Sequence, residues 1–127
     1  MKQNLQTPAT PLEMLSLFLP AGLLDYFDLV NHVSQETCFI FFLEEKPSIP
    51  QEHSHLHLHS KGFFPEIEVQ DFPVRGKAVY LRIKRRRWED PETGQTYSRD
   101  WNLVASGTRI TAEFGVFLKA LLGQSCG

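Results

Sequence analysis

The sequence predicts an α+β fold, in which a small, mainly antiparallel sheet with a basic hairpin packs against N-terminal helices and a C-terminal helix. Three observations predict this class. Apolar residues recur at helical spacing near both ends, the middle of the chain alternates apolar and polar residues, and Pro- or Gly-containing turns separate these stretches. With 127 residues, 42% of them hydrophobic, the chain can bury one core. We therefore expect a single domain over 1–127, flexible at 1–10 and folded from 11 to 122.

The N-terminal part is predicted to be helical. A first helix is expected from Thr10 to Leu19, because Thr10 can cap it and Pro11 suits the first helical position. A second amphipathic helix is expected over 23–30. There, four apolar residues are spaced to share one face: Leu23, Leu24, Phe27 and Val30.

The centre of the chain is predicted to form strands. Thr37–Leu43 is short and rich in aromatic and β-branched residues, which is typical of a buried strand. A connection follows over 44–60. A hairpin should come next, with its turn around Val74, Val69 opposite Val79 and Ile67 opposite Leu81. This register places Glu66 and Glu68 on the same face as Arg82 and Lys84.

The C-terminal part is predicted to contain one more turn, strand and helix. Asp90–Gly94 has the composition of a turn, and a strand should follow over Thr96–Val104. A helix is expected from a Thr111 cap to Gly123, with a single apolar stripe.

Charge is distributed unevenly along the chain, although the net charge is only -2. Residues 1–60 carry two basic and seven acidic side chains, whereas residues 61–127 carry eleven and eight. The segment KAVYLRIKRRRW is the most basic. On a strand, alternate cations would lie about 6.7 Å apart, close to the spacing of phosphates along a nucleic-acid strand. The alternative is a solvated face that nearby acidic residues neutralise.

We therefore predict phosphate contacts from this segment, with further candidates at the hairpin tip and flanking it. The candidate DNA-binding residues are Arg75, Lys77, Arg82, Lys84, Arg85, Arg86, Arg87, Arg99 and Arg109. Trp88 and Trp101 could stack on bases, but aromatic residues beside strands more often belong to the core.

Four alternate histidines at 53, 55, 57 and 59 would share one side of an extended backbone. Such a row can chelate a transition metal, but no cysteine accompanies it, and a solvent-facing polar edge is the simpler interpretation. We expect no metal and no cofactor. The sequence also lacks a glycine-rich phosphate loop, an HExxH motif and a nucleophile elbow, so we expect no enzyme.

Neither a membrane span nor a secretory signal is evident. The apolar segment after the polar N-terminus is interrupted by charged residues and proline, so we expect a cytoplasmic protein without membrane contact. Cys38 and Cys126 are too few for a disulfide scaffold.

Five motifs stand out along the chain: HSKGFFPEI, DFP-x-RGK, KRRRW, RDWNLVA and GTR-x-T-x-EF. Together they resemble the N-terminal region of a group of bacterial insertion-sequence transposases, encoded as a short reading frame upstream of the catalytic one. The resemblance covers roughly Leu12 to Leu122. The group in turn resembles a zinc-binding N-terminal domain of a broader transposase family. Where those relatives carry cysteines, this chain has none, at 53–59 and 88–97.

The resemblance implies a non-catalytic domain that recognises the terminal inverted repeats of the element. Cutting and joining of strands would then belong to a separate catalytic subunit, and a homodimer stays open. Two rival interpretations remain. The basic hairpin could dock onto the catalytic subunit without binding DNA alone, or the histidines could form a metal-dependent hydrolase.

Overall fold

The structure is a computed structural model that describes residues 10–107 and 112–124. It confirms the α+β class with mainly antiparallel strands. The helices of the described ranges are α1 (Pro11–Ser16), α2 (Leu23–Tyr26), α3 (Trp101–Gly107) and α4 (Ala112–Gln124), with a 3-10 helix at Gln51–His53. The strands are β1 (Phe27–Ser34), β2 (Cys38–Glu45), β3 (His59–Phe63), β4 (Ile67–Val74), β5 (Lys77–Lys84), β6 (Arg86–Glu89) and β7 (Thr96–Tyr97).

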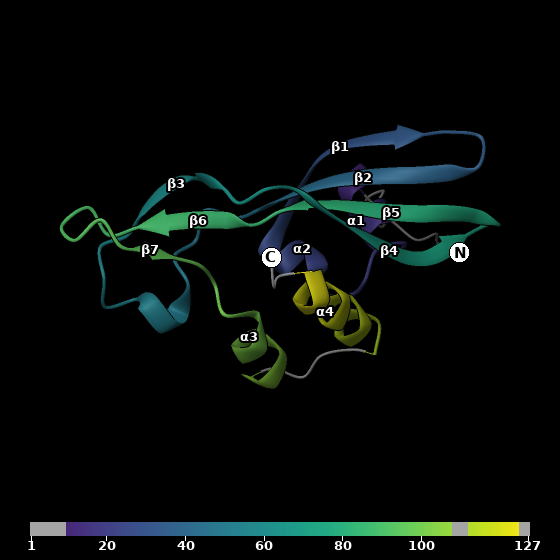
Figure 1. The fold of residues 1–127 in the computed structure, drawn as a ribbon. Helices are drawn as coiled ribbons and strands as arrows, with labels where there is room; N and C mark the ends of the chain where they lie inside the picture. The colour runs from purple at the N-terminus through teal and green to yellow at the C-terminus, as the bar shows by residue number, and fades with distance from the viewer. Residues whose placement is uncertain (1–9, 108–111, 125–127) are drawn as a thin grey trace, which may run out of the picture.

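The strands form two sheets that lie end to end (Figure 1). The larger has the order β1-β2-β5-β4, with β2 and β5 parallel and the other pairs antiparallel. The smaller has the order β3-β6-β7. Only Arg85 separates β5 from β6, so one nearly continuous run of chain links the two sheets. We expected a single sheet, whereas the strand partners change across Arg85, from β2 and β4 before it to β3 and β7 after it.

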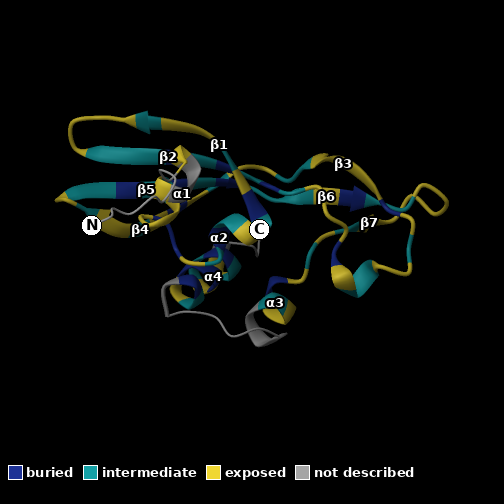
Figure 2. Ribbon diagram, turned by 180° about the vertical axis from the view of Figure 1, so that it is seen from behind, coloured by how far each residue is buried: buried dark blue, intermediate teal, exposed yellow. Residues whose placement is uncertain are grey.

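The core lies between the larger sheet and helices α2, α3 and α4, which share one side of the sheets (Figures 1 and 2). Alternate residues of β2 and β5, such as Leu43 and Leu81, point into it, and Phe117 and Leu121 of α4 meet them there. Gly22 precedes α2 with φ +92°, and a Cβ atom at this position would lie 3.2 Å from the Phe114 ring. The close approach of α2 and α4 therefore depends on glycine.

The predicted helix over 23–30 is wrong beyond Tyr26. α2 has four residues, and Phe27 already has extended backbone angles. β1 instead pairs with β2, with Phe27 opposite Glu45 and Leu29 opposite Leu43. The apolar spacing is helical, but pairing with the strongly β-prone segment at 38–45 outweighs it, and Val30 lies exposed at an irregularity of the strand. By contrast, α1 begins as predicted at Pro11, although it ends at Ser16 rather than near Leu19.

The β4–β5 hairpin is confirmed, but its register differs from the predicted one by two residues. Val69 pairs with Leu81 and Ile67 with Ile83. The turn lies at Arg75 and Gly76, which both have positive φ, at 51° and 77°. Such a two-residue turn matches the right-handed twist of the flanking strands. A shift of two residues keeps every side chain on its predicted face.

The predicted strand over 96–104 is wrong after Tyr97. β7 has two residues, and helix α3 begins at Trp101. Asp100 precedes this helix, and its Oδ1 accepts the backbone N–H groups of Asn102 and Leu103 at 3.0 and 3.2 Å. This is the geometry of a helix N-cap. The predicted C-terminal helix is confirmed as α4, whereas its cap, Thr111, lies outside the described residues.

The histidine tract is not an extended row. His53 ends the 3-10 helix, a turn follows, and His59 begins β3. No group of three His, Cys, Asp or Glu side chains in the described part of the chain is placed to hold a metal ion. No helix among these residues is long and apolar enough to cross a bilayer.

Candidate nucleic-acid interface

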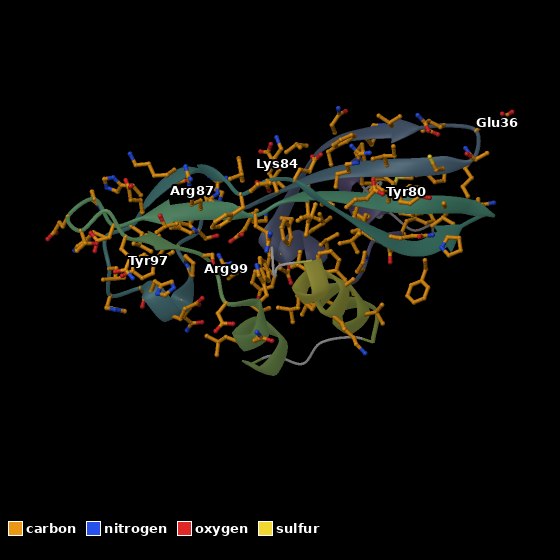
Figure 3. The ribbon with its side chains drawn as sticks, viewed as in Figure 1. Glu36, Tyr80, Lys84, Arg87, Tyr97 and Arg99 are labelled. Carbon is orange, nitrogen blue, oxygen red and sulfur yellow. The ribbon has the colours of Figure 1, made fainter. Side chains whose placement is uncertain are left out.

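The basic segment divides into side chains that face outward and side chains that face the interior. On β5, Leu81 and Ile83 are fully buried, so Arg82 and Lys84 lie on the opposite face of the sheet. The strand ends there, and β6 begins with Arg86 turned inward and Arg87 exposed. Lys84 and Arg87 lie on the side of the sheets away from α3 and α4, whereas Arg99 lies on the helix side (Figure 3). The basic residues that are adjacent in the sequence therefore lie on different sides of the sheets.

Arg82 is partly neutralised by the neighbouring strand. Its Nε lies 3.0 Å from Glu68 Oε1, and its Nη1 lies 3.8 Å from Glu66 Oε1. This pairing confirms that the two glutamates share the face of Arg82. Both glutamates are partly exposed, so water screens these pairs and the guanidinium stays accessible at the surface.

Lys61, Lys84 and Arg87 extend the cationic surface beyond Arg82. The Nε and Nη2 atoms of Arg87 donate to the Lys61 carbonyl at 3.3 and 3.0 Å, which fixes the arginine beside β3. Lys61 also lies 3.6 Å from Glu89. Lys84 takes part in none of the ion pairs between described residues. We call this set the outer cation row: Lys61, Arg82, Lys84 and Arg87.

Arg86 and Arg99 instead bind Glu45, which is 1% exposed. The Glu45 carboxylate accepts the Arg86 backbone N–H at 3.0 Å and Arg99 Nε at 2.9 Å. Arg86 Nε donates to the Glu45 carbonyl at 3.0 Å, and its Nη1 donates to Ser60 Oγ at 2.6 Å. Arg99 also donates to the Ser48 carbonyl at 2.7 Å. We call these three charged residues the Glu45 clamp, because they tie β2, β6 and the chain after β7 together.

Burial affects the ionisation of the clamp carboxyl. Loss of hydration raises the pKa of Glu45 above its ordinary value, against the lowering effect of the hydrogen bonds from Arg86 and Arg99. The side chain of Arg99 is 9% exposed and contacts the rings of Tyr26 and Trp101. Arg86 and Arg99 therefore hold the fold together, and their guanidinium groups already have partners within the protein.

The hairpin tip is a separate cationic region. Arg75 is exposed in the turn, and Lys77 Nζ donates to the Gln35 carbonyl at 2.8 Å while lying over the Phe39 ring. The seven steps from Lys77 to Lys84 span about 23 Å of strand. The tip and the outer cation row therefore lie at opposite ends of β5.

Three further candidates lie elsewhere. Arg85 lines a recess on the helix side together with Arg99. Arg109 lies outside the described residues. Trp88 and Trp101 are 3% and 5% exposed, which makes them core residues rather than stacking platforms.

Sequence reasoning missed Lys61 and Glu45. Lys61 joins the row only because β3 pairs with β6, a contact between segments far apart in the chain. Glu45 had a local signal. It continues the alternation of Phe41 and Leu43, which places it on the buried face of β2.

No protein-family model, no curated protein and no solved structure matches the chain. The function is therefore argued from the geometry of the site and from the sequence resemblance.

Proposed function

We propose that this chain is the non-catalytic DNA-binding region of a transposase, and that it contacts DNA phosphates through the outer cation row. The single observation that carries the proposal is the placement of Lys84 and Arg87 on the helix-free side of two sheets joined through one chain. Arg82 and Lys84 share a face at the strand spacing of about 6.7 Å, which suits successive phosphates.

The sequence resemblance supports the more specific parts of the proposal. The target would be the terminal inverted repeats of an insertion sequence, and the site of action the cytoplasm. Strand cutting and joining would belong to a separate catalytic subunit. Phosphate contacts supply affinity and position the domain, while base readout needs an element that enters a groove. The β4–β5 hairpin tip, with exposed Arg75, is our candidate for that element.

Fluorescence anisotropy with the terminal repeat and a scrambled duplex, over a salt series, tests the proposal. The native protein should bind the repeat more tightly. The double variant Lys84→Gln/Arg87→Gln should bind about tenfold more weakly at low salt, and the slope of log affinity against log salt should fall in magnitude by about 2, because about two phosphate contacts are lost.

Lys119→Gln is the matched control for loss of charge, because Lys119 is exposed on α4, on the helix side of the sheets. Its affinity for the repeat should stay within about twofold of native. Native-like binding by the double variant, or no binding of either duplex at low salt, would contradict the proposal.

A second candidate function, docking onto the catalytic subunit, is favoured by a different surface. Four apolar side chains near the hairpin are 48–80% exposed: Met14, Leu17, Phe18 and Phe72. Leu17, Phe18 and Phe72 line a common recess, and Phe18 and Arg75 line a neighbouring one. Clusters of exposed apolar side chains are typical of surfaces that bind another protein.

Binding of the catalytic subunit to Leu17→Ser/Phe72→Ser tests this second function. The variant should bind the subunit at least tenfold more weakly and the terminal repeat as the native protein does. Light scattering of the isolated chain separates this outcome from self-association, in which the same variant would turn a dimer into a monomer.

A further inference from the structure

A recess of about 550 Å³ lies on the helix side of the sheets and is partly open to solvent. The 3-10 helix, the β5–β6 junction, the chain before α3, and the start of α3 contribute to its walls, and Figure 1 shows the 3-10 helix and α3 on the same side of the sheets. The lining residues that matter here are Glu52, Phe64, Arg85, Ser98, Asp100 and Trp101. The recess has the size of a small-ligand site and mixes aromatic with polar walls.

The acidic groups of this recess already have partners. Glu52 Oε2 accepts the Asp100 backbone N–H at 2.6 Å. Asp100 Oδ1 accepts the N–H groups of Asn102 and Leu103. Arg99, the other arginine of the wall, is paired with Glu45. Glu52 Oε2 and Asp100 Oδ1 therefore accept from backbone N–H groups, and Glu45 pairs with Arg99, so none of these carboxylates pairs with Arg85.

Arg85 is the arginine of this recess that has no acidic partner among the described residues. Its Nε is buried and has no hydrogen-bond partner, and none of the ion pairs between residues 10–107 and 112–124 includes it. Its guanidinium carbon lies 5.9 Å from the centroid of the Phe64 ring. The arginine as a whole is only half-buried, so the rest of its guanidinium can serve a ligand in the recess, and buried donors such as this Nε are normally paired.

We propose that the recess binds a phosphate group through Arg85. A guanidinium presents its N–H groups in a planar fork that matches the oxygen atoms of a phosphate. The volume exceeds what phosphate alone would fill, and the rings of Phe64 and Trp101 border the remaining space. Both inorganic phosphate and a nucleotide carry the required chemistry. Because Lys84 and Arg87 lie on the other side of the sheets, this site does not depend on the proposed DNA interface, and either can fail alone.

Isothermal titration calorimetry in chloride buffer at constant ionic strength tests the site. The probes are inorganic phosphate, thymidine 5′-monophosphate and thymidine. Both phosphate compounds should bind saturably at one site per chain, and thymidine should bind at least tenfold more weakly than its monophosphate. Tighter binding of the monophosphate than of phosphate would identify a nucleotide as the source, and equal binding would identify the phosphate group alone. No saturable binding of either compound would overturn the proposal and leave a water molecule as the partner of Arg85.

Variants locate the binding. Arg85→Gln should weaken phosphate binding at least tenfold, whereas Lys119→Gln, which removes one exposed positive charge elsewhere, should not. If Arg85→Gln fails to fold, exposed Ser98 at the wall offers a matched pair. Ser98→Glu brings a carboxylate to the recess and should weaken binding at least tenfold, while Ser98→Gln, of equal length, should bind within threefold of native. Equal affinities for Ser98→Glu and Ser98→Gln would overturn the site.

Discussion

Arg86 and Arg87 are neighbours in the chain and share a residue type, yet they lie in opposite environments. Arg86 is half-buried and donates hydrogen bonds to the buried Glu45 and to the exposed Ser60. Arg87 turns outward and rests on a backbone carbonyl at the surface. The comparison of the Glu45 clamp with the outer cation row shows that a run of like charges is not one functional unit. Alternation along a strand divides it between stabilising the fold and offering charge to a partner.

The largest expected effect comes from removing the acidic centre of the clamp. Glu45→Ala leaves the nearly buried Arg99 without its carboxylate and should lower the free energy of unfolding by about 3–5 kcal/mol. Glu45→Gln keeps an acceptor and should cost less, roughly 1–3 kcal/mol. Urea denaturation followed by circular dichroism measures both. Equal losses in the two variants would show that packing, rather than hydrogen bonding to the arginines, makes Glu45 important.

A smaller effect should separate the two neighbouring arginines. Arg86→Ala removes side-chain bonds to Glu45 and Ser60 and should cost about 2–3 kcal/mol of unfolding free energy, as hydrogen bonds of charged groups do. Arg87→Ala, at an exposed position, should change it by no more than about 0.5 kcal/mol. Thermal or urea unfolding of the pair is the measurement. If Arg87→Ala proved as costly as Arg86→Ala, the division between inner and outer cations would break down.

The smallest expected effect concerns the direction of a pH dependence. Because burial raises the pKa of Glu45 above 4.5, the folded state favours the protonated carboxyl. This contribution is fully present below about pH 4.5 and is lost as pH rises through the pKa of the folded state. The unfolding free energy of the native protein, minus that of Glu45→Gln, should therefore fall over this range and then level off. A rise instead would mean that attraction to Arg86 and Arg99 outweighs the loss of hydration.

The fold could be predicted where one local signal dominated. The strand around Phe41 and Leu43, the basic hairpin and the C-terminal helix all follow from periodicity and β propensity. Prediction failed where a helical spacing was not used as a helix. Phe27 and Val30 are spaced as on one helix face, yet β1 pairs with β2, Phe27 is buried and Val30 is exposed at an irregularity of the strand. Asp100 caps a helix within the segment after the Asp90–Gly94 turn, where a strand over 96–104 was predicted.

The basic segment that carries the candidate site could be predicted from the sequence, but the contacts of its side chains could not. The sequence indicated where the cations concentrate. Glu45 lies 41 positions from Arg86 and 54 positions from Arg99 in the sequence, and nothing local to either arginine indicates that it accepts their hydrogen bonds. Such pairing depends on how two sheets meet. The outer cation row likewise needed the β3–β6 pairing to bring Lys61 beside Arg87.

Gly22 sets a limit on how this chain can diverge. Its left-handed backbone disfavours every L side chain, and a Cβ atom would meet the Phe114 ring at 3.2 Å. The backbone strain and the tight contact with Phe114 both act against substitution at this position, whereas exposed positions of the outer cation row can exchange lysine for arginine with little cost to the fold. We therefore expect descendants of this sequence to keep this glycine even where their surface charges have drifted.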